Sequence, residues 1–326
     1  MTVALLEGIL QPGPNQRRAI AKAITLLEST RVDHRQQADT LLTALLPHTG
    51  CSFRLGLSGV PGVGKSTLIE VLGLHLIAQG QRVAVLTIDP SSTVSGGSIL
   101  GDKTRMEMLS VHDSAYIRPS PSSGTLGGVA EKTREAMLVC EAAGYHTVIV
   151  ETVGVGQSET AVASMTDLFV LMQLPNAGDD LQAIKKGVME LADIVLINKA
   201  DTNPLAAERA LLQITQAMQL LGMHQRSNSS RWQPRALQIS ALQNDGVEVF
   251  WAAVLEFKTR QAANGQLAER RQSQALAWMW ERIDTELKRA FKQNPSVSGL
   301  LPETLRQVVL GQIPASVAAR NLLAAQ

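Results

Sequence analysis

The sequence predicts an α/β fold in which a mostly parallel sheet is covered by helices, with helical extensions at both ends. Between residues 52 and 260, short runs rich in Val, Ile and Leu alternate with helical segments. This alternation is typical of a parallel sheet buried on both faces. Outside that region only helical periodicity remains. We therefore expect an N-terminal helical extension at 1–48, a main domain at 49–262 and a C-terminal helical arm at 263–326.

The individual elements follow from the hydrophobic spacing. In the N-terminal part, helices are expected at 17–28 and 38–46, the second ended by Pro47. Six strands are expected at 53–58, 82–88, 146–150, 167–172, 194–197 and 235–239. One helix is expected between the fourth and fifth of these strands. Other helices are expected at 66–79, 129–143, 205–221 and 247–259. The C-terminal part predicts helices at 267–293, 303–310 and 315–324.

The long C-terminal helix carries an apolar stripe that the main domain does not need for its own core. An amphipathic helix of this kind either folds back or meets a partner, and we expect it to form the contact of a homodimer. The stripe consists of Leu276, Met279, Trp280, Ile283 and Leu287.

Composition excludes several function classes. The net charge of +1 gives no electrostatic reason to expect nucleic acid or an anionic membrane as a partner. The two cysteines, Cys51 and Cys140, are far apart and predict free thiols in a reducing compartment. The six histidines do not cluster, so no transition-metal site is expected.

The N-terminus has no secretory pattern, and no apolar run approaches the roughly 20 residues that span a bilayer. We expect a cytoplasmic protein.

A glycine loop follows the strand expected at 53–58. It matches the pattern G-x-x-x-x-G-K-[ST], in which backbone N–H groups surround phosphate and the next helix begins with its positive dipole end. Lys65 is expected to contact the β- and γ-phosphates, and the Ser66 hydroxyl to bind Mg²⁺. The nucleotide-binding residues predicted here are Gly59, Val60, Pro61, Gly62, Val63, Gly64, Lys65, Ser66 and Thr67.

Carboxylates follow other strands at the same edge of the sheet. Asp89 and Glu151 each end an apolar run, and Mg²⁺ on a nucleotide needs hard oxygen ligands. Asp102 lies in a loop after a Ser- and Gly-rich stretch. Its spacing alone favours a magnesium ligand no more than a solvated loop charge.

Residues 151–154 resemble the D-x-x-G switch of GTPases, with Glu151 in place of Asp. Gly154 would lie near the γ-phosphate and respond to its loss. Gln157 is a candidate for orienting water, although Val155 and Gly156 separate it from Gly154. With Lys65 and Glu151 it completes the predicted catalytic set. The departure from the Ras-like spacing predicts slow intrinsic hydrolysis that a partner accelerates.

A second motif, Asn198-Lys-Ala-Asp201, follows the strand expected at 194–197. Asp201 can accept two hydrogen bonds from guanine that adenine cannot donate, and Lys199 can lay its alkyl stem along the base. A backbone N–H in the segment Ser240, Ala241 and Leu242 would meet guanine O6. Together with the glycine loop, this motif predicts a P-loop GTPase that binds GTP and GDP.

Residues 174–187 have no equivalent in a minimal GTPase. They combine Asp179, Asp180, Lys185 and Lys186 with turn residues. One interpretation is an ordinary helix start capped by Asp180; the other is a third switch that transmits nucleotide state to a partner. Spacing does not decide between them.

Taken together, these segments resemble the MeaB/ArgK-type GTPases that accompany methylmalonyl-CoA mutase. The resemblance covers nearly the whole chain, including 17–29, the glycine loop, 88–92, 101–106, 118–128, 151–159 and 174–187. It implies a homodimeric GTPase chaperone that loads and protects an adenosylcobalamin-dependent mutase. It also implies that Ser66, Asp89, Asp102 and Glu151 surround Mg²⁺ and that 174–187 touches the mutase.

Two alternatives remain open. The family has carried an older description as an ATP-dependent kinase of basic amino-acid transport, which the guanine motif argues against. A metal-insertion GTPase would be expected to carry Cys and His clusters near its switches, and the sequence has none.

Overall fold

Seven parallel strands form one sheet in the computed structural model of the chain, in the order β3-β2-β4-β1-β5-β6-β7. The structure describes residues 2–88, 106–119, 126–152, 158–175, 186–223 and 232–326. The strands are β1 (Phe53–Gly59), β2 (Val83–Ile88), β3 (Ala115–Pro119), β4 (Thr147–Thr152), β5 (Leu168–Gln173), β6 (Ile194–Ile197) and β7 (Arg235–Gln238). This confirms the predicted α/β fold.

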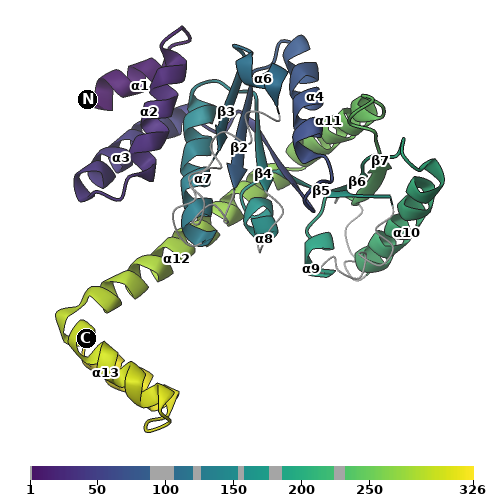
Figure 1. The fold of residues 1–326 in the computed structure, drawn as a ribbon. Helices are drawn as coiled ribbons and strands as arrows, with labels where there is room; N and C mark the ends of the chain where they lie inside the picture. Colours follow the sequence, from purple (N-terminus) through teal and green to yellow (C-terminus); the bar gives the residue numbers. More distant parts are fainter. Residues whose placement is uncertain (1, 89–105, 120–125, 153–157, 176–185, 224–231) are drawn as a thin grey trace. The chain divides into compact units, whose positions relative to one another are not determined.

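Helices cover both faces of the sheet (Figure 1). On one face lie α4 (Lys65–Ala78), α6 (Glu107–Val111) and α11 (Val247–Ala263). The other face carries α7 (Leu126–Ala142), α8 (Ser158–Ala163), α9 (Lys186–Met189) and α10 (Pro204–Met223). Successive strand residues serve the two cores in turn, because side chains alternate across a strand. In β4, Val148 and Val150 join the α7 side and Ile149 joins the α4 side.

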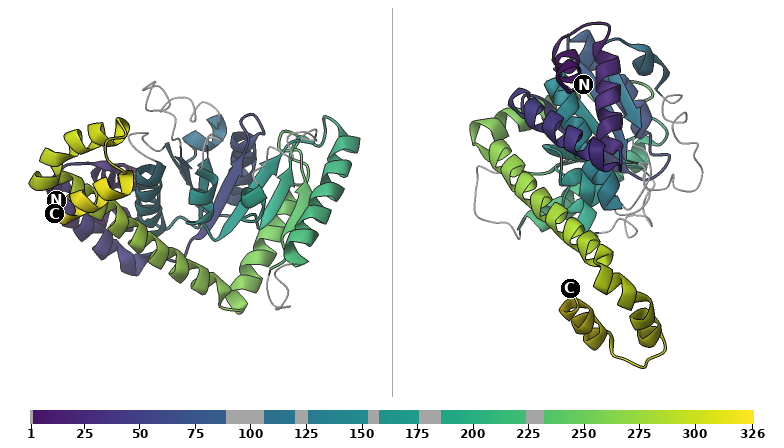
Figure 2. Two further views of the ribbon diagram at one scale, coloured as in Figure 1. Left: turned by 90° about the horizontal axis from the view of Figure 1, so that it is seen from below. Right: turned by 90° about the vertical axis from the view of Figure 1, so that its left-hand side faces the viewer.

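The N-terminal residues form three helices that pack beside α7 (Figure 2). They are α1 (Thr2–Leu10), α2 (Gln16–Glu28) and α3 (Val32–Leu45), the last followed by a 3-10 turn at Leu46–His48. Buried Gln16 joins α2 to α1 and to the turn after α7: its amide nitrogen donates to the carbonyls of Ile9 and Ala143, at 2.7 and 3.0 Å. Arg82 donates to the Gln16 amide oxygen at 2.8 Å and stacks over Tyr145.

The chain forms two compact units, Met1–Ala268 and Glu269–Gln326. The C-terminal helices are α12 (Gln266–Gln293), α13 (Pro295–Val309) and α14 (Ala315–Ala324). In the second unit only Val297, Ala318 and Leu322 are buried among the described residues. On α12, Leu276, Trp280 and Leu287 are each at least 60% exposed. The predicted apolar stripe therefore covers no core within this unit.

Differences from the sequence expectations have local causes. Helix α1 and strand β3 were not expected; β3 is a short edge strand that includes Arg118 and Pro119. Helix α13 begins eight residues before the predicted start at 303, because the Asn294 side chain caps it and Pro295 fits its first turn. Both cysteines are free, as predicted, and burial raises the pKa of the Cys140 thiol above its usual range. Among the described residues, no helix is long and apolar enough to cross a membrane.

Candidate nucleotide site

The glycine loop lies where the strand order changes direction. Central strand β1 is flanked by β4 on one side and by β5 on the other, so the loop after β1 opens at the carboxyl edge between two strand ends. In parallel sheets, ligands bind in the crevice formed at such a point. Leu57 is opposite Glu151, and Gly59 is opposite Met172.

Two glycines in the loop are required by its geometry. Gly59 has a φ of +153°, and a Cβ there would lie 2.5 Å from the Met172 carbonyl oxygen. Gly64 has a φ of +99°, a left-handed conformation that side chains rarely adopt. A Cβ at Gly64 would lie 2.4 Å from the Asn198 amide nitrogen. The loop thus fits closely between β5 and the Asn198 side chain.

Lys65 begins α4 and folds back over the loop. Its ammonium donates to the carbonyl oxygens of Gly59 and Val60, at 2.7 and 3.2 Å, and the residue is only 6% exposed. The cation is thereby held at the loop beside the N-terminus of α4, whose first N–H groups have no intrahelical acceptors. Val60, Pro61 and Gly62 are exposed at the tip, and Thr67 is half-buried in the first turn of α4.

Two hard oxygen donors meet beside the loop. The Ser66 hydroxyl donates to Oε1 of Glu151 at 3.4 Å. Glu151 is buried on β4 one residue before the strand ends at Thr152, slightly further along than predicted. A hydroxyl and a carboxylate at this separation are the types of ligand that Mg²⁺ prefers. The other expected magnesium ligands, Asp89 and Asp102, lie outside the described residues, as does Gln157.

Asn198 connects the glycine loop to the predicted base-binding segment. Its amide nitrogen donates to the Val63 carbonyl at 2.7 Å, and its amide oxygen accepts from the Ala241 N–H at 3.0 Å. Asn198 is 2% exposed, so both bonds are shielded from water. One side chain therefore ties together three loops, which follow β1, β6 and β7.

The remaining residues of the two motifs are placed around that bridge. Lys199 has a φ of +61°, an uncommon value for a residue other than glycine, and its carbonyl accepts from the Thr202 N–H and hydroxyl. Asp201 is exposed, without a hydrogen bond to another described residue. Its carboxylate is therefore free to accept hydrogen bonds from a base, which would shield it from water once bound.

The segment after β7 forms a tight turn. Ser240 and Asp245 exchange backbone hydrogen bonds at 3.0 Å, and Gly246 closes the turn with a φ of +74°. The Ala241 N–H is already bonded to Asn198. Leu242 is 77% exposed, and its N–H makes no hydrogen bond to another described residue. Of the three backbone N–H groups at 240–242, that of Leu242 is therefore the one free to meet a base.

A link from α4 to α6 was not predicted from the sequence. Glu70, one turn after Ser66, accepts from the N–H groups of Met108 and Leu109, at 2.8 and 3.4 Å. It thereby caps the start of α6.

Among the described residues, no three His, Cys, Asp or Glu side chains are arranged to hold a metal ion by themselves.

A sequence model of one family matches residues 20–296, and its description is methylmalonyl Co-A mutase-associated GTPase MeaB. The match contains the glycine loop, the Asn198–Asp201 motif and all seven strands. The chain belongs to the MeaB family. It is therefore a GTPase that binds guanine nucleotide, as the two motifs predicted, and the resemblance stated from the sequence is confirmed.

Relatives of this MeaB family member align over most of its length. A Caulobacter vibrioides protein named putative GTPase is 53% identical over 95% of this chain and 94% of its own. The mouse mitochondrial protein named methylmalonic aciduria type A homolog is 46% identical over 95% of this chain and 76% of its own. The crystal structure of a protein named LAO/AO transport system kinase is 37% identical in sequence, with a TM-score of 0.76, and covers 99% of this chain and 95% of its own.

Proposed function

We propose that this GTPase is a chaperone for an adenosylcobalamin-dependent methylmalonyl-CoA mutase, gating cofactor loading and protecting the enzyme from inactivation. The observation that carries the proposal is the match over residues 20–296 to a family described as mutase-associated. The name of the mouse relative, which refers to methylmalonic aciduria, supports a link to the same methylmalonyl chemistry. The GTPase site supplies the switch, because a protein that binds differently in its two nucleotide states can release a partner after hydrolysis.

The magnesium environment in this proposal consists of Ser66 and Glu151, joined by Asp89 and Asp102. The described pair fits a hard cation, since a hydroxyl and a carboxylate lie 3.4 Å apart at the strand edge. Bound Mg²⁺ would neutralise charge between the β- and γ-phosphates. Lys65, held over the loop by two carbonyls, adds a positive charge to the same phosphates.

Guanine selection is assigned to Asp201, with Lys199 along the base and a backbone N–H of the 240–242 segment at O6. Asp201→Asn should weaken GTP binding and favour xanthosine triphosphate, whose 2-oxo group replaces the amino donor. Competition binding with GTP, XTP and ATP measures this preference. Retained GTP preference in the variant would refute the role of Asp201.

Hydrolysis is proposed to depend on Lys65, Glu151 and Gln157 and to be slow until the mutase is bound.

We further propose a homodimer formed through the C-terminal helices and a cytoplasmic location. We also propose a third switch at 174–187 and the division of the chain into three parts at residues 48 and 262. The exposed stripe on α12 supports the dimer contact.

The test of the chaperone function uses the full chain and the purified mutase. We expect complex formation with a non-hydrolysable GTP analogue to differ from that with GDP, and GTP turnover to rise when the mutase is added. Titration calorimetry and phosphate release measure the two effects. Failure to bind the mutase in either nucleotide state, with turnover unchanged, would overturn the proposal.

A second candidate is a kinase function, suggested by the name of the structurally similar LAO/AO transport system kinase. It requires ATP preference and a phosphorylated protein product. The position of the Asn198–Asp201 motif at the end of β6 favours guanine instead. Displacement of a labelled nucleotide by ADP as effectively as by GDP would favour the kinase.

A further inference from the structure

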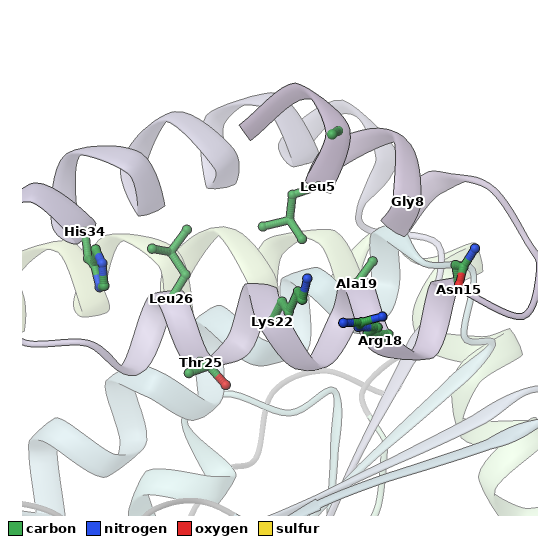
Figure 3. A pocket seen from close by; sticks show the side chains of 10 residues that line it. Leu5, Gly8, Asn15, Arg18, Ala19, Lys22, Thr25, Leu26 and His34 are labelled. Carbon is green, nitrogen blue, oxygen red and sulfur yellow. The ribbon is translucent and has the colours of Figure 1, made fainter. Parts of the chain in front are cut away.

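A cavity of about 640 Å³ lies between α1 and α2, near the start of α3 (Figure 3). No residue of the nucleotide site lines it. Its apolar floor includes Leu5, Ala19 and Leu26, and α2 supplies polar residues along one wall. Pockets of this volume accommodate ligands or the side chains of a docked segment.

The charges at this cavity are all of one sign. Arg18 and Lys22 lie one helical turn apart on α2, and neither has an ion-pair or hydrogen-bond partner among the described residues. No Asp or Glu of the described chain lines the cavity. Neighbouring cations are differently placed: Arg17 donates to the Ser110 carbonyl, and Arg31 pairs with Asp33. The unpaired cations favour an anionic occupant.

The shape favours a segment of a protein. The lining residues of α2 run from Asn15 to Leu26, which is about 16 Å of helix. A segment laid along α2 over this length can therefore contact lining residues at both of its ends. An apolar floor below exposed cations is also the anatomy of an interface, with its hydrophobic core and polar rim.

The wall of the cavity is connected to the nucleotide helix. Arg17 of α2 bonds to the Ser110 carbonyl in α6, at 3.1 Å, and α6 is capped by Glu70 of α4. At the other end of α2, Glu28 pairs with Arg118 of β3 at 2.6 Å. A partner bound to α2 would thus contact an element joined to the helix that carries Lys65 and Ser66.

We propose that the groove between α1 and α2 docks an amphipathic segment of the mutase, with apolar side chains on the Leu5, Ala19 and Leu26 floor and carboxylates on Arg18 and Lys22. This inference rests on the proposed chaperone function. It assigns the N-terminal helices a direct part in partner recognition.

The test compares the affinity of full-length variants for the mutase in the presence of a GTP analogue. Arg18→Glu and Lys22→Glu should each weaken binding at least tenfold, because each places a carboxylate against the acidic segment. Ala4→Trp, at an exposed lining position, should weaken binding similarly by filling the groove without changing charge. Arg209→Glu, an equivalent charge reversal on exposed α10, is the matched control and should bind as the unaltered chain does.

GDP affinity and thermal melting of each variant check that the fold is intact. If the unaltered chain binds the mutase and the groove variants bind equally well, the docking inference is wrong and the chaperone proposal stands. If the unaltered chain does not bind, both fall. The molar mass of the Ala4→Trp variant is also measured without the mutase. If it differs from that of the unaltered chain, the groove binds a second copy of the chain, and the inference is overturned.

Discussion

Gly64 and Gly62 differ in one respect that a substitution can isolate. Both have a positive φ, but a Cβ at Gly62 meets nothing within 4 Å, whereas a Cβ at Gly64 meets the Asn198 amide. Gly62→Ala should therefore add only the backbone strain, about 1–2 kcal/mol. Gly64→Ala should also displace Asn198 and reduce GDP affinity more than tenfold beyond the effect of Gly62→Ala. Fluorescent-nucleotide titration measures both, and equal losses would contradict the contact.

Asn198→Ala removes both ends of a buried bridge. The Val63 carbonyl and the Ala241 N–H lose their partner together, which should cost about 2–4 kcal/mol of unfolding free energy. Nucleotide affinity should fall with it, because the loops are no longer tied. The control is Asn203→Ala, which removes a single exposed bond to the Ala206 N–H. Urea denaturation distinguishes the two, and similar small losses would show that the bridge contributes little.

At the scale of elements, most of the sheet could be predicted, because buried parallel strands are continuous apolar runs. The predicted strand 194–197 and the predicted helix 315–324 coincide with β6 and α14. The edge strand β3 lacks such a run and was missed. The bond from Asn198 to Val63 spans 135 residues, and no local period encodes that contact. The two motifs predicted the site residues, but no local pattern indicated that Asn198 joins the loops.

Gln16 tests how the N-terminal helices are attached. Gln16→Ala removes the donor to the Ile9 carbonyl and one partner each of the Ala143 carbonyl and Arg82, which stay bonded to each other. We expect a loss of about 1–3 kcal/mol of unfolding free energy. The substitution should also accelerate hydrogen exchange in α1 more than in β1. Gln37→Ala is a suitable control, since the side-chain oxygen of Gln37 is buried without a hydrogen-bond partner among the described residues. A neutral Gln16→Ala would mean that apolar packing, together with the Arg17–Ser110 and Glu28–Arg118 contacts, is sufficient to hold these helices.

At the scale of the whole molecule, the apolar stripe of α12 predicts self-association. Leu276→Glu combined with Trp280→Glu should convert a dimer to a monomer, because two charges would be buried in the contact. Light scattering at several concentrations measures the mass. Thr285→Glu, on the opposite side of α12, should leave the dimer intact. A monomeric unaltered chain, or a dimer that survives the double substitution, would contradict this assignment.

The Asn198 bridge also limits how nucleotide preference can change during evolution or engineering. A substitution at Asn198 alters the glycine loop and the 240–242 turn at once. We therefore expect mutants at this position to lose nucleotide binding before they acquire a preference for another base. Asp201 is exposed and bonded to no described residue, so it can vary without disturbing its neighbours. If Asp201 selects the base as proposed, new base preferences are accessible through single substitutions there, while Asn198 keeps the glycine loop and the 240–242 turn joined.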